Sequence, residues 1–562
     1  MDADARNRTS RPDTLPALMD RAVARFSDRP AIDFLGRQWT YGEVGRLVDR
    51  LASGLRKLGV DKGVNVGLCL PNTPYSVLFY FAVLKAGGVV VNYNPLYTAR
   101  ELLTQIRDSQ TTIMVVMDLH RIYEPAASIA QEAGLKHLVV CPMAGALPGL
   151  KSTLFRLFKR RELASIPADA LHVPYETLAA SAPIGSAAAR PVSSDLAVLQ
   201  YTGGTTGVPK GAMLTHCNLI ANMWQIIDHA GEEALHPGEE RILCILPLFH
   251  VFALTVSMNV AIAIGAEMIL LPQFKLEEVF ATIRRRKPTL LPAVPTIYGA
   301  INGAAEKQKV DLTSIRLCIS GGAALAQEVA SRFEELTGCR LAEGYGLTEC
   351  SPVVTVNPLD GRPRRPGSTG IAVPGTIIEI RDPDHPDRLM PPGEKGEVCV
   401  RGPQVMAGYW KRPDDTRAVM IEGALRTGDI GYLDGEGYLY LVDRIKDLII
   451  CSGYNVYPRV IEEALYEHPC VSEVVAIGIP DPYRGESPKA FVTLREGAEV
   501  TPEQLHHFLI ERLSRIEMPS SIEIRASLPR TMIGKLSRKE LIAEEKARAA
   551  APHTTSSSLS EH

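Results

Sequence analysis

The chain has 562 residues, a length that at roughly 150 residues per domain predicts about three to four folding units. Hydrophobic residues make up 46% and charged residues 22%, so the composition excludes a disordered or fibrous protein. Because 61 Lys and Arg stand against 64 Asp and Glu, the net charge of −3 provides no whole-chain positive field, and we expect no nucleic-acid partner.

The first fourteen residues are polar and lack the apolar core of a signal peptide, so residues 1–14 are expected to be a disordered N-terminus. The ten cysteines form no CxxC pair and no Cys/His cluster with zinc spacing. This pattern favours free thiols in a reducing cytoplasm over a disulfide framework or a structural metal site.

Strand-like apolar runs alternate with amphipathic segments through most of residues 15–445, which predicts a large α/β domain of layered subdomains with parallel strands. After about Gly367, short strands punctuated by Gly and Pro predict a small β-barrel-like subdomain. Residues 446–545 have the pattern of a small α+β domain, and residues 546–562 that of a disordered tail.

Residues 150–164 have the pattern of a basic amphipathic helix. Leu150, Leu154, Leu157 and Phe158 share one face, and Lys151, Arg156, Lys159 and Arg160 occupy the other. Such a helix can lie on anionic lipid, which indicates a peripheral place on the inner face of the membrane. An ordinary surface helix that packs on its own core is the alternative, and the sequence leaves both open.

Residues 242–266 contain no Asp, Glu, Lys or Arg and are long enough to span a bilayer. However, Pro247, His250, Asn259 and Gly265 interrupt this stretch. A buried strand, a turn and a core helix are therefore favoured, with a membrane span as the alternative.

The segment Tyr201–Gly211 (YTGGTTGVPKG) follows an apolar strand and has the composition of a phosphate-binding loop. Its glycines allow several backbone N–H groups to converge on one anion, while the threonine hydroxyls and Lys210 add donors and charge. It is not a Walker A loop, because Pro209 precedes the lysine and Gly211 stands where Ser or Thr would ligate magnesium.

Four later motifs are weak signals alone but form a strong one through their order and spacing. They are Glu343–Glu349 (EGYGLTE), Arg426–Asp429 (RTGD), Asp443–Asp447 (DRIKD) and Leu528–Lys535 (LPRTMIGK). With the phosphate loop they make the chain resemble the acyl-adenylate-forming (AMP-binding) enzyme superfamily from about Leu15 to Ile542. This superfamily includes acyl-CoA synthetases, adenylation domains of nonribosomal peptide synthetases and firefly-type luciferases. Within it, the runs LQYTGGTTG, EGYGLTECSP and GPQVMAGYW make the chain look most like bacterial long-chain fatty-acid–CoA ligases.

The resemblance implies a two-step reaction that uses ATP, Mg²⁺ and coenzyme A. A carboxylate attacks the α-phosphorus of ATP to give acyl-AMP and pyrophosphate, and the CoA thiol then displaces AMP. A medium- or long-chain fatty acid is the expected substrate, with a dicarboxylic or aromatic acid as the alternative. A luciferase-type mono-oxygenase and a membrane carrier for fatty acids are rival interpretations.

By resemblance, three groups of residues bind the nucleotide and perform the first step. The nucleotide-binding residues are Thr202, Gly203, Gly204, Thr205, Thr206, Gly207, Lys210, Gly321, Gly322, Glu343, Gly344, Tyr345, Gly346, Asp429 and Arg444. Glu349 resembles the magnesium ligand, with Thr348 beside the α-phosphate. Lys535 resembles the catalytic lysine that bridges the carboxylate and the α-phosphate.

The family also implies that the small C-terminal domain is mobile and rotates between the two steps. Lys446 matches the hinge position, and Gly453 would line the path of the CoA pantetheine arm.

The acyl pocket is expected around His250, Val251, Phe252 and Val294. Amino-acid-activating relatives carry an aspartate where His250 stands, so an apolar acid is favoured over an amino acid. The sequence leaves open the chain length of the acid, the role of His250 and the oligomeric state, for which a homodimer is one option.

Overall fold

The computed structural model describes residues 11–183, 190–202, 209–231, 234–451, 454–481, 483–531 and 535–550. The chain divides into two compact units. Unit 1 comprises Met1–Glu379, Cys399–Arg426 and Glu436–Leu439, and unit 2 comprises Ile380–Val398, Thr427–Gly435 and Tyr440–His562. The sequence predicts a domain boundary between residues 445 and 446, and this boundary remains a prediction.

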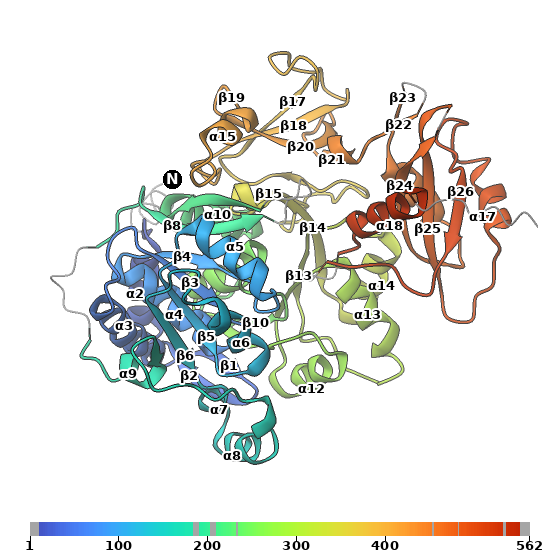
Figure 1. The fold of residues 1–562 in the computed structure, drawn as a ribbon. Coiled ribbons are helices and arrows are strands. Elements are labelled where there is room, and N and C mark those ends of the chain that lie inside the picture. The colour runs from blue at the N-terminus through green and yellow to red at the C-terminus, as the bar shows by residue number, and fades with distance from the viewer. Residues whose placement is uncertain are drawn as a thin grey trace, which may run out of the picture. The chain divides into compact units, whose positions relative to one another are not determined.

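Unit 1 contains a seven-stranded sheet (Figure 1). Its three central strands are buried throughout. The order is β7 (His172–Pro174), β6 (His137–Cys141), β5 (Ile113–Met117), β3 (Asn65–Cys69), β4 (Val89–Asn92), β8 (Leu196–Thr202) and β9 (Lys210–Thr215). All pairings are parallel except the antiparallel β8–β9 pair. Continuous apolar runs such as IMVVM in β5 suit parallel strands that are covered on both sides.

A second, nine-stranded sheet also belongs to unit 1. Its order is β16 (Ile371–Ala372), β15 (Val353–Val356), β14 (Arg340–Gly346), β13 (Leu317–Ser320), β12 (Leu290–Ala293), β10 (Arg241–Cys244), β11 (Glu267–Leu270), β1 (Pro30–Phe34) and β2 (Arg37–Thr40). The pairings from β14 to β1 are parallel, and those at both ends of the sheet are antiparallel. The carboxyl ends of the parallel strands therefore meet at one edge, where α/β proteins place their ligands.

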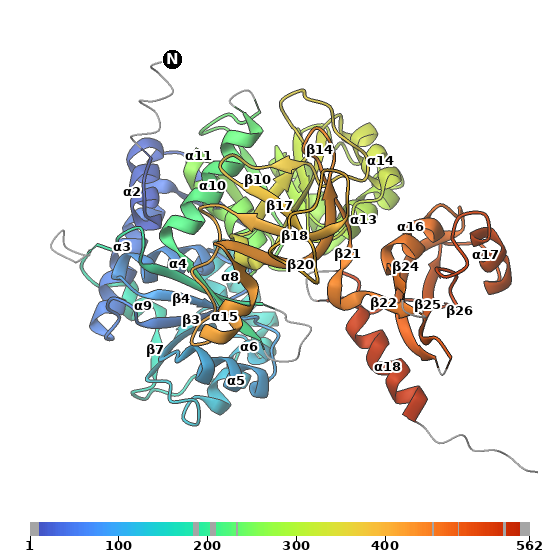
Figure 2. The same ribbon diagram turned by 90° about the horizontal axis from the view of Figure 1, so that it is seen from above.

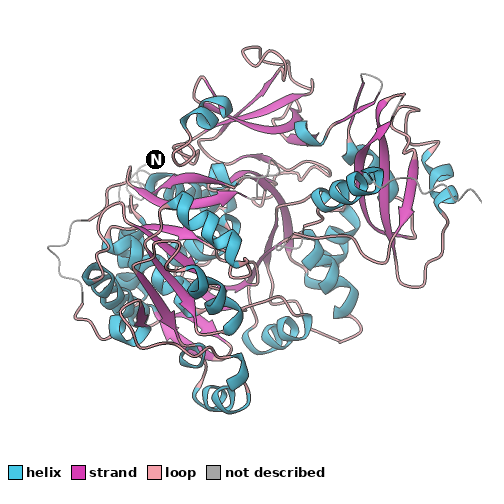
Figure 3. Ribbon diagram, in the orientation of Figure 1, coloured by secondary structure: helices cyan, strands magenta, loops and turns pink. Residues whose placement is uncertain are grey.

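Helices flank these sheets, as Figure 3 shows. Those of unit 1 are α2 (Leu15–Phe26), α3 (Tyr41–Lys57), α4 (Pro74–Ala86), α5 (Ala99–Ser109), α6 (His120–Ile129), α7 (Met143–Ala146), α8 (Gly149–Phe158), α9 (Tyr175–Ala179), α10 (His216–Ala230), α11 (Val260–Ile264), α12 (Leu276–Arg286), α13 (Pro295–Ala305), α14 (Gln327–Thr337) and α15 (Pro413–Val419). Local sequence sets their ends. Capping boxes begin α3 at Thr40 and α10 at Thr215, and Gly87 ends α4 with a φ of 94°. The α/β class predicted from the alternating pattern is confirmed.

The apolar stretch 242–266 forms β10, a π-helix (Ala253–Asn259) and α11, and α11 lies beside α10 (Figure 2). All seven residues of the π-helix are buried. Among the described residues, none of the helices combines the length and the apolarity that crossing a bilayer requires. The prediction of a buried strand, turn and core helix is confirmed.

Where the small β subdomain was predicted, a five-stranded sheet forms. Its order is β17 (Ile377–Arg381), β18 (Gly396–Arg401), β20 (Ala424–Leu433) and β19 (Met420–Ile421), with β21 (Leu439–Arg444) paired to β20.

The C-terminal part of unit 2 is an α+β structure built on one more sheet. Its order is β23 (Tyr454–Val456), β22 (Ile449–Cys451), β25 (Gly485–Leu494) and β24 (Val471–Asp481), with β26 (Ser521–Ile524) paired to β25. The helices are α16 (Pro458–Tyr466), α17 (Pro502–Leu509) and α18 (Arg538–Ala550). Its core gathers apolar residues from β24, β25, α16 and α17. Helix α18 ends at Ala550, inside the segment for which the sequence predicts a tail.

Candidate functional site

The predicted phosphate loop joins two antiparallel strands. Strand β8 ends at Thr202 and β9 begins at Lys210, and these two residues face each other in the pairing. Both ends of the loop are thus held at one point of the sheet. The five other predicted loop residues, Gly203, Gly204, Thr205, Thr206 and Gly207, lie outside the described residues.

The Lys210 side chain is fixed beside this loop by two contacts. Its Nζ donates to Asp415 Oδ1 at 2.7 Å and lies 5.3 Å from the ring centre of Tyr409. The Tyr409 segment runs along β9, because Met213 donates to the Gly408 carbonyl at 2.9 Å and Ala407 donates back to Met213 at 3.0 Å. This pairing holds a positive charge at the exit of the predicted phosphate loop.

Glu349 is brought to the same place. It lies in a 3₁₀ turn (Thr348–Cys350) that packs against β8 and β9. Tyr409 Oη donates to Glu349 Oε1 at 2.7 Å, and the Met406 amide donates to the Glu349 carbonyl at 2.8 Å. Burial, and then the neighbouring Glu349 charge, raise the pKa of Tyr409, so its phenol remains a proton donor. The structure thus brings Thr202, Lys210, Thr348 and Glu349 together within unit 1.

Other predicted residues gather at the carboxyl edge of the nine-stranded sheet. Gly321 and Gly322 directly follow β13, and Glu343–Gly346 end the neighbouring strand β14. Glu343 Oε1 accepts from the Leu325 amide at 3.2 Å, which ties the two segments. A Cβ at Gly346 would lie 2.1 Å from the Pro352 carbonyl oxygen, so only glycine fits there without a backbone shift.

The predicted acyl-pocket residues lie along the same edge. Phe252 belongs to the segment after β10, Val294 follows β12, and Gly321 follows β13. The Phe252 ring lies against Gly321, whose Cβ, if present, would be 3.1 Å from Phe252 Cζ. Val251 and Val294 are buried, and the half-buried His250 accepts from the Phe252 amide through Nδ1 at 3.4 Å. Small and apolar groups therefore dominate this part of the edge.

Unit 2 brings three other predicted residues together. Arg444 Nε lies 3.1 Å from Asp429 Oδ1, and the Asp429 side chain is only 9% exposed. Burial and the positive charge of Arg444 lower the pKa of Lys535 to about 8, whereas Asp429 raises it. An ammonium whose pKa lies near neutrality can change its charge during a reaction cycle.

The predicted hinge residue Lys446 lies in a 3₁₀ turn (Ile445–Asp447) between two acids that share one partner. Arg538 Nη1 lies 3.4 Å from Asp443 Oδ1 and 3.1 Å from Asp447 Oδ2. Arg538 Nη2 also donates to both oxygens of Glu462, at 2.8 and 2.9 Å. This cluster fixes the turn to α16 and to the start of α18. The predicted pantetheine-path residue Gly453 lies outside the described part of the chain.

The donor set around Glu349 fits magnesium held jointly with a substrate. The described residues contain no group of three or more His, Cys, Asp or Glu side chains that could hold a metal by themselves. Mg²⁺, however, is commonly bound by one or two carboxylates together with substrate phosphates. One carboxylate beside the predicted phosphate loop meets that requirement.

Sequence reasoning missed four side chains of these clusters: Tyr409, Asp415, Glu462 and Arg538. The run GPQVMAGYW, which contains Tyr409, was a usable signal because it contributed to the family resemblance. Arg538 follows the lysine of the last motif by three residues, but nothing local shows that it contacts the turn at Lys446.

Comparison with known proteins supports one family. A family model described as AMP-binding enzyme matches residues 19–410, and one described as AMP-binding enzyme C-terminal domain matches residues 460–535. A long-chain-fatty-acid–CoA ligase of Bacillus subtilis is 42% identical over 532 residues, which are 93% of this chain and 92% of that protein. A long-chain-fatty-acid–CoA ligase of Escherichia coli O6:H1 is 38% identical over 538 residues, 93% of each chain.

A solved structure has the same fold. The crystal structure of ATP-bound MatB from Rhodopseudomonas palustris superimposes with a TM-score of 0.82 at 30% identity. The match covers 94% of this chain and 99% of that one.

Proposed function

The chain belongs to the AMP-binding enzyme family, and on this premise we propose that it is an ATP-dependent fatty acid–CoA ligase. It activates a medium- or long-chain acid as acyl-AMP with release of pyrophosphate and then transfers the acyl group to CoA. The observation that carries this proposal is the cluster of Lys210, Tyr409 and Glu349 at the ends of the β8–β9 loop. It combines a phosphate-binding loop with a cation and a carboxylate suited to magnesium.

In the first step, the loop from Thr202 to Lys210 binds the β- and γ-phosphates. Lys210 leaves Asp415 for a phosphate oxygen, and Tyr409 keeps the Glu349 carboxylate turned toward the loop. Glu349 would hold Mg²⁺, which when bound would neutralise charge on the phosphate oxygens. Thr348 donates its hydroxyl to the α-phosphate. Positioning and charge neutralisation of this kind are the main demands of phosphoryl-type transfer.

The rest of the nucleotide is bound by the other predicted residues. Tyr345 covers the adenine. Residues around Tyr345 give the adenine room and polar contacts: Gly321, Gly322, Glu343, Gly344 and Gly346. Asp429 accepts the ribose hydroxyls, and Arg444, its ion-pair partner, lies near the ribose and the α-phosphate.

Lys535 stabilises the charge that develops as the substrate carboxylate attacks the α-phosphorus and the bond to pyrophosphate breaks. Its ammonium bridges the carboxylate and an α-phosphate oxygen. The pKa of about 8 means that the charged form still predominates at neutral pH. In the second step, the CoA thiolate attacks the acyl carbon and AMP leaves.

The two steps need two orientations of the small domain, and we place the hinge at Lys446. Lys535 would block the approach of CoA if it stayed at the reacting carboxylate. The domain of residues 446–545 rotates against residues 15–445, and Gly453 then lines the pantetheine path, where a missing side chain leaves room.

The acyl chain occupies the apolar edge beside Phe252 and Gly321, with Val251, Val294 and His250 around it. Each buried methylene contributes about 0.8 kcal/mol, so binding tightens with chain length until the pocket ends. We place the enzyme in the cytoplasm and at the inner face of the membrane, where long-chain acids accumulate.

A pyrophosphate-release assay over a panel of carboxylic acids, with and without CoA, tests the proposal. Saturated fatty acids should release pyrophosphate, and CoA should then yield the thioester and AMP. Faster turnover of a dicarboxylic or aromatic acid would overturn the fatty-acid assignment, and no ATP consumption with any acid would overturn the ligase assignment.

A further inference from the structure

Helix α8 packs none of its ten residues into a core. Leu150, Leu154, Leu157 and Phe158 are 77%, 43%, 68% and 79% exposed. Their spacing places them on one face of the helix. Twelve large apolar side chains are exposed in the described part of the chain. These four make up a third of them, and all four lie in the nine-residue stretch 150–158 of α8. Such a concentration of exposed apolar groups marks a surface that binds a partner.

Basic residues flank this apolar face. Residues 150–162 contain five Lys and Arg and one acid, Glu162, which pairs with Lys159 at 2.5 Å. Arg156, Arg160 and Arg161 are exposed. The sequence pattern predicted one helix over residues 150–164, but α8 ends at Phe158 and a 3₁₀ turn (Arg160–Glu162) follows. The chain therefore presents Phe158 and the two arginines together at the end of the helix.

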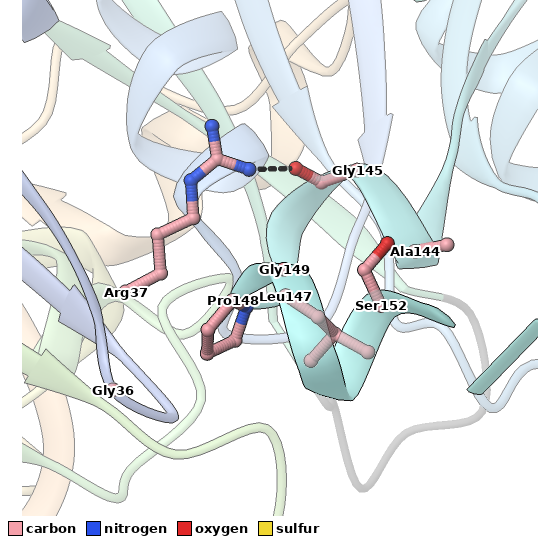
Figure 4. A pocket seen from close by; sticks show the side chains of 8 residues that line it. All are labelled: Gly36, Arg37, Ala144, Gly145, Leu147, Pro148, Gly149 and Ser152. Carbon is pink, nitrogen blue, oxygen red and sulfur yellow. Dashed lines mark hydrogen bonds between the residues drawn. The ribbon is translucent and has the colours of Figure 1, made fainter. Parts of the chain in front are cut away.

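The N-terminal end of α8 is anchored to unit 1. Lys151 Nζ donates to the Leu35 carbonyl at 2.7 Å, and Arg37 donates to the Gly145 carbonyl of α7, the helix just before α8. A cavity of about 540 Å³ lies between these segments. Figure 4 shows the residues that line it. Figure 1 shows α8 at the lower edge of unit 1, next to α7. The anchor fixes the direction of the helix, and its apolar face is left without a partner among the described residues.

We propose that α8 and the basic turn after it dock the enzyme on an anionic lipid bilayer. The four apolar side chains enter the acyl region while Arg156, Arg160 and Arg161 bind lipid phosphates. Charge favours this occupant over a second copy of the chain, since a two-fold contact through α8 would bring two basic surfaces together. The biological role of this docking rests on the proposed function, because a docked ligase takes its acid directly from the bilayer.

Vesicle co-sedimentation with the full chain tests the docking. The chain should bind phosphatidylcholine vesicles that contain phosphatidylglycerol and bind pure phosphatidylcholine vesicles weakly, with binding reduced by added salt. Arg160→Gln with Arg161→Gln should weaken binding to the anionic vesicles by about tenfold or more, as should Leu154→Ser with Leu157→Ser. The control variants Leu96→Ser and Arg100→Gln with Lys136→Gln alter residues that are also exposed but lie outside α8, and they should bind normally.

Three results would overturn the docking surface: equal binding to both kinds of vesicle, normal binding by the α8 variants, or a dimer in solution that the α8 variants dissociate. Octanoate activation without vesicles separates this test from that of the proposed function. The α8 variants should activate octanoate like the unaltered chain. If the unaltered chain binds anionic vesicles but activates no acid, the ligase proposal fails and the docking surface stands.

Discussion

The side chain of Tyr409 connects Glu349 to Lys210. Its hydroxyl donates to Glu349 Oε1 at 2.7 Å, while its ring centre lies 5.3 Å from Lys210 Nζ. A single aromatic residue thus sets the distance between the cation and the carboxylate that we assign to the phosphates and to magnesium.

Tyr409→Phe should therefore impair ATP use without disturbing the fold. The ring still supports Lys210, but Glu349 loses a hydrogen bond of the charged type, which contributes about 1.5–3 kcal/mol. We expect a loss of about tenfold or more in kcat/KM for Mg·ATP, measured by pyrophosphate release across a magnesium titration. Tyr123→Phe removes a phenol bonded to His172 at 2.8 Å and serves as the control. An unaltered magnesium dependence in Tyr409→Phe would remove Tyr409 from this role.

Lys535 should give the first step a pH dependence. Its pKa is lowered to about 8, so the ammonium is lost as the pH rises through that value. Acyl-AMP formation should fall above about pH 8, whereas transfer to CoA from supplied acyl-AMP should show no such fall.

Three variants test this assignment. Lys535→Arg should remove the fall in rate above pH 8, because guanidinium stays charged. Lys535→Ala should abolish acyl-AMP formation while sparing transfer. Asp429→Asn should move the fall in rate to lower pH, since Asp429 raises the pKa of Lys535. Equal loss of both steps in Lys535→Ala would contradict the assignment.

Local sequence chemistry accounts for much of what could be predicted. Continuous apolar runs such as IMVVM at β5 predict buried parallel strands, and the Gly/Thr composition around Lys210 predicts a phosphate loop, because both depend on residues close in sequence. Tyr409 lies about two hundred residues from Lys210, and their contact exists only because residues 407–410 run along β9. No periodicity encodes that pairing.

The two sheets show the same limit. The alternation of strands and helices predicts the α/β class, but strand order depends on how whole layers pack, as when β1 at residue 30 pairs with β11 at residue 267. Helix α8 is a different case. The apolar and basic residues keep a helical spacing past Phe158, so the sequence predicts a helix to residue 164. The backbone, however, leaves the helical region at Lys159, where φ is −109° and ψ is 17°.

Arg538→Gln should destabilise the C-terminal α+β structure. Arg538 is the shared partner of the buried Asp443 and of the partly buried Asp447 and Glu462. Its loss leaves these carboxylates uncompensated, at a cost of about 3 kcal/mol. Urea unfolding should show this loss, and the exposed Arg548→Gln, which also removes ion pairs, should show little change.

The same variant should respond to pH in a defined direction. Burial raises the pKa of Asp443 and of Glu462, and Arg538 opposes that shift. An acid with a raised folded-state pKa contributes stability at low pH, which is lost as the pH rises through that pKa. The stability deficit of Arg538→Gln should therefore shrink as the pH falls. A deficit that stays constant from neutral to mildly acidic pH would show that these carboxylates are not its cause.

Lys446→Pro should stall the second step selectively. Proline fixes φ near −65° and removes the backbone donor, which would prevent a rotation centred on this residue. Pyrophosphate release in a single turnover should persist, while acyl-CoA formation should drop by about a hundredfold or more, because misplacing the reacting groups by about 1 Å already costs that much. Lys446→Ala keeps the backbone free and should transfer acyl groups normally. Normal transfer by the proline variant would place the hinge elsewhere.

Phe252→Ala should change which acids the enzyme prefers. The ring lies against Gly321 at the apolar edge, so its removal opens space there that bulkier or longer acyl groups can fill. Relative kcat/KM should shift toward branched or longer acids, by about tenfold or less, because a few methylenes in an apolar pocket discriminate only weakly. The opposite change, Gly321→Ala, places a Cβ 3.1 Å from Phe252 Cζ and should favour shorter acids. Activity measured over octanoate, dodecanoate and hexadecanoate tests both variants, with Mg·ATP saturating so that the nucleotide site does not limit. If both variants lower every rate in the same proportion, Phe252 does not line the acyl pocket.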